Sequence, residues 1–428
     1  MFKDWSGHED DYRKFLEVLL DWTIGDVPVK LKSKFRMFDS KKDLNCADPT
    51  YENVLTGKKL AKERVIVDFI PFGYDVDKLE IRLHDTFNAV DCFVIYESPR
   101  TLSGLAKPMY FPMIMHSDRF RPYLSKIIHL NATFSDIQQQ TLKVRRSVGT
   151  AFKSGNWELD FAMRTEMVKR FNAVQNSALK AFVMSHLQGA YGIQNDADEI
   201  VNGKVLYHVK HCEIKREVDF IFAPSFAFKK NFHWLQNTVD LGCLKGSNIN
   251  DQTEKLRFHL WRPGPYIWPL GTILRENSTL RYHKYEGREC QHHLGLGAAT
   301  HMSSLAEPVM YWLKRCGVNE QSYKGAVSPE LVRAGRDGAI TPELIYASTI
   351  SPYCSKWDVP PARHISTHTT QAQDIWLKSI PQVVTDNPSS FPFLLPGLNG
   401  PHGTVGLMSR SADSHWSDLC SLSNATAM

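Results

Sequence analysis

The stretch that most constrains the fold of this chain is residues 64–96, where an apolar run, a helical pattern and a second apolar run follow one another. Residues 64–70 read Arg-Val-Ile-Val-Asp-Phe-Ile and are followed by Pro71, which is typical of a buried strand. Apolar residues at helical spacing over 75–87 then predict a helix, with Asp75 as its N-cap. Residues 92–96, Cys-Phe-Val-Ile-Tyr, form the second run. A strand, a helix and a strand in this order predict a parallel βαβ unit and therefore an α/β fold.

Further elements and the length of 428 residues predict one large domain with extensions. We expect an N-terminal extension over 1–62, a principal domain over 63–396 and an irregular tail over 397–428. Apolar patterns predict more elements, namely helices at 9–24, 157–171, 178–187 and 376–384 and strands at 125–130, 219–228 and 256–261.

Residues 191–200, Tyr-Gly-Ile-Gln-Asn-Asp-Ala-Asp-Glu-Ile, place three carboxylates within four residues. Clustered carboxylates repel one another and persist most easily where a cation shares their charge. In a strand, alternation would put Asp196 and Asp198 on one face, which suits Mn or Mg and leaves coordination positions for a diphosphate. We expect the motif at the carboxyl end of a strand, where open α/β sheets bind ligands. The alternative is an acidic turn or helix start, with Glu199 in the first turn.

A glycine-rich segment, residues 294–304, precedes a predicted helix that carries Val309 and Trp312. Glycines at such a place allow backbone N–H groups to approach a phosphate, although ordinary loops also contain them. No Gly-Lys-Ser/Thr follows, so the segment is not a P-loop. No G-x-G-x-x-G follows the first strand either, which argues against a dinucleotide-binding fold.

Composition excludes several classes of protein. The net charge of +5 is mild and no dense Lys/Arg run occurs, so we expect no nucleic-acid partner. No apolar run reaches the roughly 18 residues of a membrane span, and no signal peptide is visible. The 8 cysteines include no C-x-x-C pair, which argues against structural zinc, and their spacing does not reveal a disulfide framework.

Taken in order, these pieces resemble glycosyltransferase family 17. The resemblance covers about 64–396, and no one piece carries it alone. The matching pieces are the strand at 64–72, Leu-Glu-Ile-Arg at 79–82, Val-Ile-Tyr-Glu-Ser at 94–98, Lys-Pro-Met-Tyr-Phe at 107–111, Trp157-Glu158 with Arg164, Asp-Ala-Asp-Glu-Ile at 196–200, His-Met-Ser-Ser at 301–304 and the segment 387–396.

The resemblance implies a GT-A type fold, with a mostly parallel central sheet flanked by helices, and a UDP-sugar donor with inversion at the anomeric carbon. It implies a divalent ion, Mn or Mg, held by Asp198 and by Asp196, which could instead contact ribose. Such an ion can neutralise the charge that grows on a leaving diphosphate. The other residues expected to bind the donor are Glu97, Ser98, Glu158 and Arg164.

An inverting displacement also needs a general base near the acceptor hydroxyl. Glu199, Glu307 and Glu320 are candidates that the sequence does not rank. His301 could bind metal, phosphate or acceptor.

We therefore expect an enzyme that moves N-acetylglucosamine from UDP-N-acetylglucosamine to a mannose-containing glycan or glycoprotein, in N-glycan processing. Family members imply a Golgi or secretory location, and membrane association rests on that analogy alone. A catalytically silent relative that binds glycans or nucleotide sugars is the main alternative. Two departures favour it: Ala299-Thr300 where the family often has Gly-Trp, and Asn319 where it often has histidine. A metal-dependent phosphohydrolase would use the same carboxylates but fits the remaining segments less well.

Overall fold

The computed structural model describes residues 38–39, 42–100, 107–133, 135–136, 155–229, 231–236, 260–261, 264–276, 291–302, 337, 362–364 and 370–387. The helical elements are η1 (Pro49–Tyr51), α2 (Val76–Thr86), α3 (Phe111–Ile114), η2 (Arg121–Lys126), α5 (Gly155–Ala173), α6 (Ala178–Ser185), α7 (Gly203–His211), α8 (Leu270–Glu276), α12 (Thr370–Ser379) and α13 (Gln382–Asp386). The strands are β1 (Leu55–Lys59), β2 (Ile66–Phe72), β3 (Cys92–Glu97), β4 (Ile127–Asn131), β5 (Tyr191–Gln194), β6 (Glu199–Val201), β7 (Cys212–Ile214), β8 (Ile221–Phe222), β9 (Ser225–Lys229), β10 (Asn231–Gln236), β11 (Leu260–Trp261), β12 (Tyr266–Pro269), β13 (Ala299–His301) and β14 (Ala362–His364).

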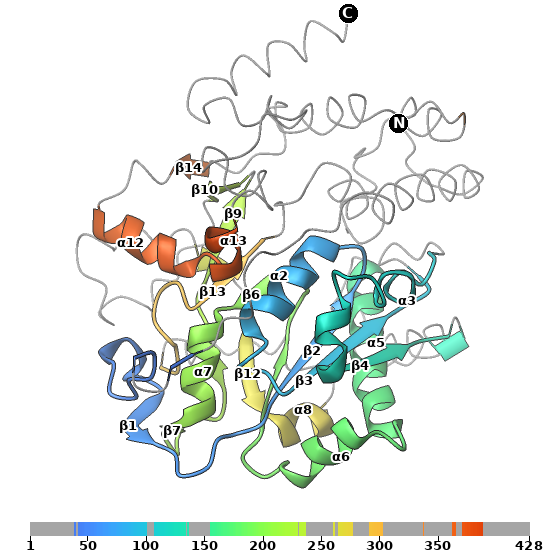
Figure 1. The fold of residues 1–428 in the computed structure, drawn as a ribbon, viewed down its shortest axis with the longest axis horizontal. Coiled ribbons are helices and arrows are strands. Elements are labelled where there is room, and N and C mark those ends of the chain that lie inside the picture. Colours follow the sequence, from blue (N-terminus) through green and yellow to red (C-terminus); the bar gives the residue numbers. More distant parts are fainter. Residues whose placement is uncertain are drawn as a thin grey trace, which may run out of the picture.

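The central sheet has six strands in the order β4-β3-β2-β5-β12-β8 (Figure 1). Strands β4, β3, β2 and β5 run parallel, whereas β12 pairs antiparallel with both β5 and β8. The predicted βαβ unit is confirmed as β2, α2 and β3, and the chain has a mixed α/β architecture. The sheet as a whole is mixed, with the expected parallel arrangement limited to one side.

Alternation along β2 explains why both faces of this sheet are buried. Ile66 and Ile70 belong to a core cluster with residues of α2 and α7, while Val67 and Phe69 belong to a second cluster with residues of α5 and α8. Successive side chains in a strand point to opposite faces, so one apolar strand serves both cores. Figure 1 shows α2 on one side of these strands and α5 on the other.

A second six-stranded sheet has the path β14-β10-β9-β13-β6, with β11 paired to β9. Strand β6 follows β5 after a short turn, residues 195–198, so the chain passes from one sheet to the other at that turn. The acidic motif therefore lies between the carboxyl end of β5 in the central sheet and the start of β6 in the second sheet.

Several sequence-based expectations need correction in detail. Asp75 occupies the N-cap position of α2, but its carboxylate accepts a 2.8 Å bond from Lys78 Nζ and makes no capping bond. The predicted strand at 219–228 is two strands, β8 and β9, and the glycine segment itself contains β13.

Other expectations fall outside the described residues or stay open. The predicted helices at 9–24 and after residue 304, and the tail over 397–428, lie outside the described part of the chain. The division at 62 and 396 stays a prediction. Within the described residues, no helix is both long and apolar enough to cross a membrane.

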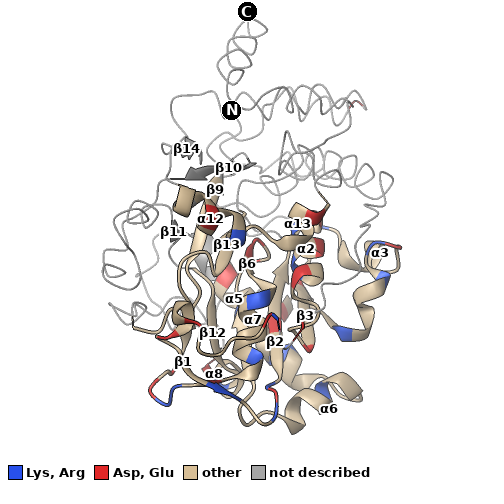
Figure 2. Cartoon of the chain, turned by 60° about the vertical axis from the view of Figure 1, so that its left-hand side comes forward, with Lys and Arg blue, Asp and Glu red and all other residues tan. Residues whose placement is uncertain are grey.

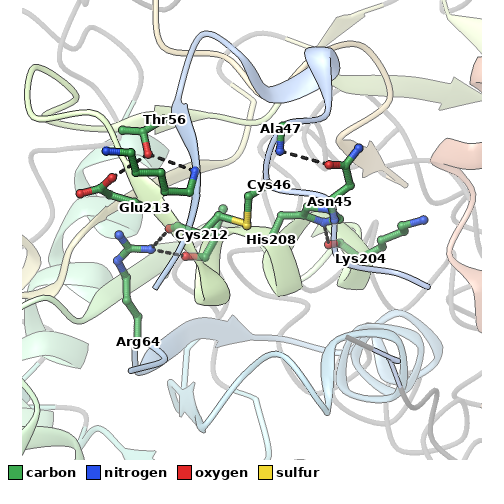
Figure 3. Close-up of a disulfide and its surroundings, with 11 residues drawn as sticks. Asn45, Cys46, Ala47, Thr56, Arg64, Lys204, His208, Cys212 and Glu213 are labelled. Carbon is green, nitrogen blue, oxygen red and sulfur yellow. Dashed lines mark hydrogen bonds between the residues drawn. A yellow bond between two sulfur atoms is a disulfide. The ribbon is translucent and has the colours of Figure 1, made fainter. Parts of the chain in front are cut away.

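A disulfide between Cys46 and Cys212 ties the N-terminal segment to the end of α7, across a sequence separation of 166 (Figure 3). The same segment contributes β1, which pairs antiparallel with β7. Arg64 supports the junction by donating hydrogen bonds to the carbonyls of Val209, at 2.7 Å, and Cys212. Cysteine spacing alone did not indicate this bridge, because its two cysteines are 166 residues apart in the sequence and meet only in the folded chain.

Candidate active site

The acidic motif lies in a turn at the carboxyl edge of the central sheet. Strand β5 ends at Gln194, and Asp196 and Asp198 belong to the turn that leads into β6. The predicted place at a strand's carboxyl end is confirmed. The expected strand alternation of the two aspartates is wrong, because residues 195–198 are not in a strand, and the alternative of an acidic turn describes the backbone.

Arg164 of α5 holds the carboxylate of Asp196. Its Nη2 donates to Asp196 Oδ1, and its Nε donates to Asp160 Oδ2 at 3.0 Å. The Arg164 side chain is only 1% exposed, whereas the Asp196 side chain is 40% exposed. A buried guanidinium with two anionic partners thus fixes one edge of an accessible carboxylate. Figure 2 shows acidic positions in the loop beside β6.

Arg82 of α2 reaches the same turn from the opposite face of the sheet. Its Nε and Nη2 form a bidentate pair with the carboxylate of Asp68, at 2.8 and 2.6 Å, and its Nη1 donates to the backbone carbonyl of Asp196 at 2.6 Å. Asp68 and Arg82 are 1% and 2% exposed in their side chains. Two arginines from the two helical layers therefore position Asp196.

Asp198 and Glu199 connect the turn to the second sheet. Asp198 Oδ2 lies 3.8 Å from His301 Nε2, and the Asp198 carbonyl accepts a 2.8 Å bond from the Met302 N–H. Glu199 pairs with His301 between β6 and β13. Its Oε2 accepts a 3.2 Å bond from the N–H of Asp196, and the residue is fully buried. The structure thus brings together Asp196, Asp198, Glu199 and His301, with Glu199 bonded inside the turn.

Glu97 ends strand β3 and Ser98 follows it, and both side chains bond to the segment after the strand. Glu97 is fully buried and accepts bonds from Lys107 Nζ at 2.7 Å and from the N–H groups of Tyr110 and Phe111 at 2.5 and 2.9 Å. Burial lowers the pKa of Lys107 and the Glu97 charge opposes that effect. Ser98 Oγ accepts a 3.1 Å bond from the Arg100 N–H. Glu97 thus holds residues 107–111 in place, and the structure does not bring it to the acidic turn.

Three further candidates cannot be placed. Glu158 lies on α5, but its side chain is outside the described residues. Glu307 and Glu320 are also outside them. Their roles stay predictions.

The sequence profile of glycosyltransferase family 17 matches residues 40–220. Over these residues the chain is similar to glycosyltransferase family 17. The match confirms the resemblance over that range, and it includes the βαβ unit, α5 and the acidic turn, whereas His301 lies beyond it. Comparisons with curated proteins and with solved structures find no match. The match supports a glycosyltransferase role and is consistent with an enzyme of the secretory pathway.

The donor atoms around the acidic turn decide whether it could hold a divalent ion. Within the described ranges no group of three or more His, Cys, Asp or Glu side chains could hold a metal by itself. The two carboxylates and the imidazole of His301 nevertheless supply oxygen and nitrogen donors that suit Mn, and a diphosphate could supply further oxygens. The residues therefore fit a metal shared with a ligand better than a closed protein site.

Two residues that support the acidic turn, Arg82 and Asp68, were not among the candidates of the sequence analysis. Arg82 follows Leu79 by three residues and precedes Leu83, so it lies on the apolar face of α2, where a charged side chain is unusual. Asp68 interrupts an otherwise apolar strand. A carboxylate in an apolar strand and a guanidinium on the apolar face of the next helix together indicate a buried ion pair, and the pattern analysis did not use this signal.

Proposed function

We propose that this chain is an inverting glycosyltransferase of the GT-A type that moves N-acetylglucosamine from UDP-N-acetylglucosamine to a mannose-containing glycan. This is the activity of β-1,4-mannosyl-glycoprotein 4-β-N-acetylglucosaminyltransferases. One observation carries the proposal: Arg164 and Arg82 hold Asp196 from both faces of the sheet, in the turn where Asp198 faces His301. A nucleotide diphosphate bound through a metal requires an accessible carboxylate in a fixed position, and Asp196, with its side chain 40% exposed, meets that requirement.

The proposed roles follow from burial and contacts. Asp198 and Asp196 would hold a divalent ion, which supplies neutralisation of the charge on the leaving diphosphate. Arg164 keeps the Asp196 carboxylate in one orientation. His301 would bind phosphate or acceptor beside Asp198. Glu199 is fully buried and bonded to the turn, so Glu307 and Glu320 are the preferred general bases.

The acceptor and the compartment are also proposals. A glycoprotein acceptor in N-glycan processing would place the enzyme in the Golgi. The Cys46–Cys212 bridge supports that compartment, because disulfides persist in oxidising environments such as the secretory pathway.

A silent nucleotide-sugar-binding relative is the second candidate, and one contact favours it. Arg164 already satisfies one oxygen of Asp196, which lessens the need for a metal at that oxygen. Ala299-Thr300 lies buried in β13, so no aromatic ring is presented there. Binding without turnover would distinguish this candidate.

The experiment is release of UDP from a panel of UDP-sugars with added manganese, with and without candidate glycan acceptors. The native chain is compared with Asp198→Ala and with Asp118→Ala, which removes a carboxylate from an exposed ion pair with Arg121. We expect the native chain to release UDP from UDP-N-acetylglucosamine only when manganese is present. Asp198→Ala should lose this release and Asp118→Ala should keep it. Donor binding without release would favour the silent relative. Release that survives Asp198→Ala, or free phosphate as the product, would contradict the assignment.

A further inference from the structure

Gln194 ends β5 and Asn195 begins the acidic turn, and the side-chain amides of both lack their full set of hydrogen bonds. Gln194 is 4% exposed, and neither its amide oxygen nor its amide nitrogen has a partner. Asn195 is 1% exposed; its Oδ1 accepts a 3.3 Å bond from the Tyr266 N–H, while its Nδ2 has no partner. Buried polar atoms are nearly always hydrogen-bonded, so three such atoms in two consecutive residues indicate a missing partner.

The strand register places Gln194 on the side of the sheet that carries Arg164. Gln194 pairs with Phe69 of β2, and Phe69 belongs to the core cluster formed with α5 and α8. Arg164 reaches Asp196 from the same α5. The amide of Gln194 and the carboxylate of Asp196 thus lie two residues apart at one sheet edge, under one helix.

The chemistry of the unpaired atoms limits what the partner can be. A carboxamide offers an acceptor oxygen and two N–H donors. A metal ion would satisfy only the oxygen of Gln194, and a phosphate would satisfy only its nitrogen. Neighbouring sugar hydroxyls satisfy both, because each hydroxyl donates one hydrogen bond and accepts others.

We infer that Gln194 and Asn195 bind a pair of vicinal hydroxyls of the nucleotide sugar and determine specificity for it. The inference rests on the proposed function, since it places a sugar nucleotide at the acidic turn. The hydroxyls belong either to the ribose or to the transferred sugar, and both offer the same hydrogen-bonding groups.

The test uses the full chain with Gln194→Leu, which removes both unpaired atoms and keeps a similar volume. Calorimetry with manganese measures binding of UDP, 2′-deoxy-UDP and UDP-N-acetylglucosamine, or whichever nucleotide sugar the native chain binds. Ser225→Ala is the matched control, because the Ser225 hydroxyl is fully buried and also lacks a partner but belongs to β9 of the second sheet. Thermal unfolding confirms that each variant folds, and Gln194→Met replaces Gln194→Leu if the latter does not.

We expect Gln194→Leu to unfold at or above the native temperature and to lose about tenfold in affinity, the effect of one or two hydrogen bonds. A loss for the nucleotide sugar alone assigns the amides to the transferred sugar. A loss for UDP but not for 2′-deoxy-UDP assigns them to the ribose. Ser225→Ala should bind all three ligands as the native chain does.

Three outcomes overturn the inference. They are unchanged affinities in Gln194→Leu, equal losses for all ligands including 2′-deoxy-UDP, and a matching loss in Ser225→Ala. If the native chain binds no nucleotide or nucleotide sugar, the proposed function fails and the inference fails with it. If the native chain binds and Gln194→Leu binds equally well, the inference fails alone.

Discussion

Arg82 donates a 2.6 Å hydrogen bond to the backbone carbonyl of Asp196 while its other nitrogens bind Asp68. The guanidinium therefore links the centre of β2 to the acidic turn through α2. Both side chains of the pair are almost wholly buried, so the charges depend on each other. Arg82 thus contributes both to the stability of the fold and to the position of the acidic turn, and substitutions can distinguish the two contributions.

Arg82→Met is expected to lower the free energy of unfolding by about 3–5 kcal/mol, because it leaves the Asp68 carboxylate buried without its partner. Asp68→Leu combined with Arg82→Met removes both charges and should recover much of that loss. The double variant still lacks the bond to the Asp196 carbonyl, so its donor binding should stay weak. Urea unfolding and nucleotide binding measure the two effects. Recovery of both together would show that Arg82 acts on the site only through stability.

Reduction of the Cys46–Cys212 bridge should release the N-terminal segment from α7 and lower stability by about 2–5 kcal/mol. Thermal unfolding with and without reductant measures the change. Cys46→Ser with Cys212→Ser is the control, because it should match the reduced native chain and show no response to reductant. A native chain that is insensitive to reductant would contradict the prediction.

Sequence patterns were sufficient where the structure depends on near neighbours. The βαβ unit follows from apolar periodicity over 64–96, and each of its three elements is confirmed to within two residues at its start. Helices α5 and α6 were predicted for the same reason. The position of the acidic motif at a strand end also follows from local order.

The features that the sequence patterns did not reveal depend on contacts between residues far apart in the chain. Arg164 meets Asp196 across a separation of 32 residues, and β12 joins β5 antiparallel through a register that no local period encodes. The acidic motif is a turn because β5 ends at Gln194 and the chain leaves for the second sheet. Glu97 was assigned to the donor from its strand-end position, whereas its contacts with residues 107–111 needed the folded chain.

Substitutions at Gly295 and Gly189 should distinguish the cost of backbone strain from the cost of steric overlap. Both have positive φ, +79° and +86°, but a Cβ at Gly295 would lie 2.6 Å from Thr50 Cγ2, while nothing lies within 4 Å of one at Gly189. Gly189→Ala should therefore lower stability by about 1–2 kcal/mol from the left-handed backbone alone. Gly295→Ala should lower it further, and Thr50→Ser should restore part of the difference by removing the methyl group. Equal losses in urea unfolding at the two glycines would contradict this account.

His293 should make stability depend on pH between about 4 and 6.5, because burial lowers its pKa from 6.5 to about 4. Its Nδ1 accepts a 3.1 Å bond from the Gly295 N–H, so protonation would also break that bond. The unfolded chain takes up the proton first as pH falls, so the contribution of His293 to stability is complete above pH 6.5 and falls by about 3 kcal/mol down to pH 4. His293→Gln should be less stable at neutral pH but should lose part of this slope. His129, His208 and His211, whose pKa values burial also lowers, add to the slope, whereas Glu80, whose pKa burial raises to about 7, opposes it. Urea unfolding at each pH gives the slope, and an unchanged slope in His293→Gln would show that other groups carry it.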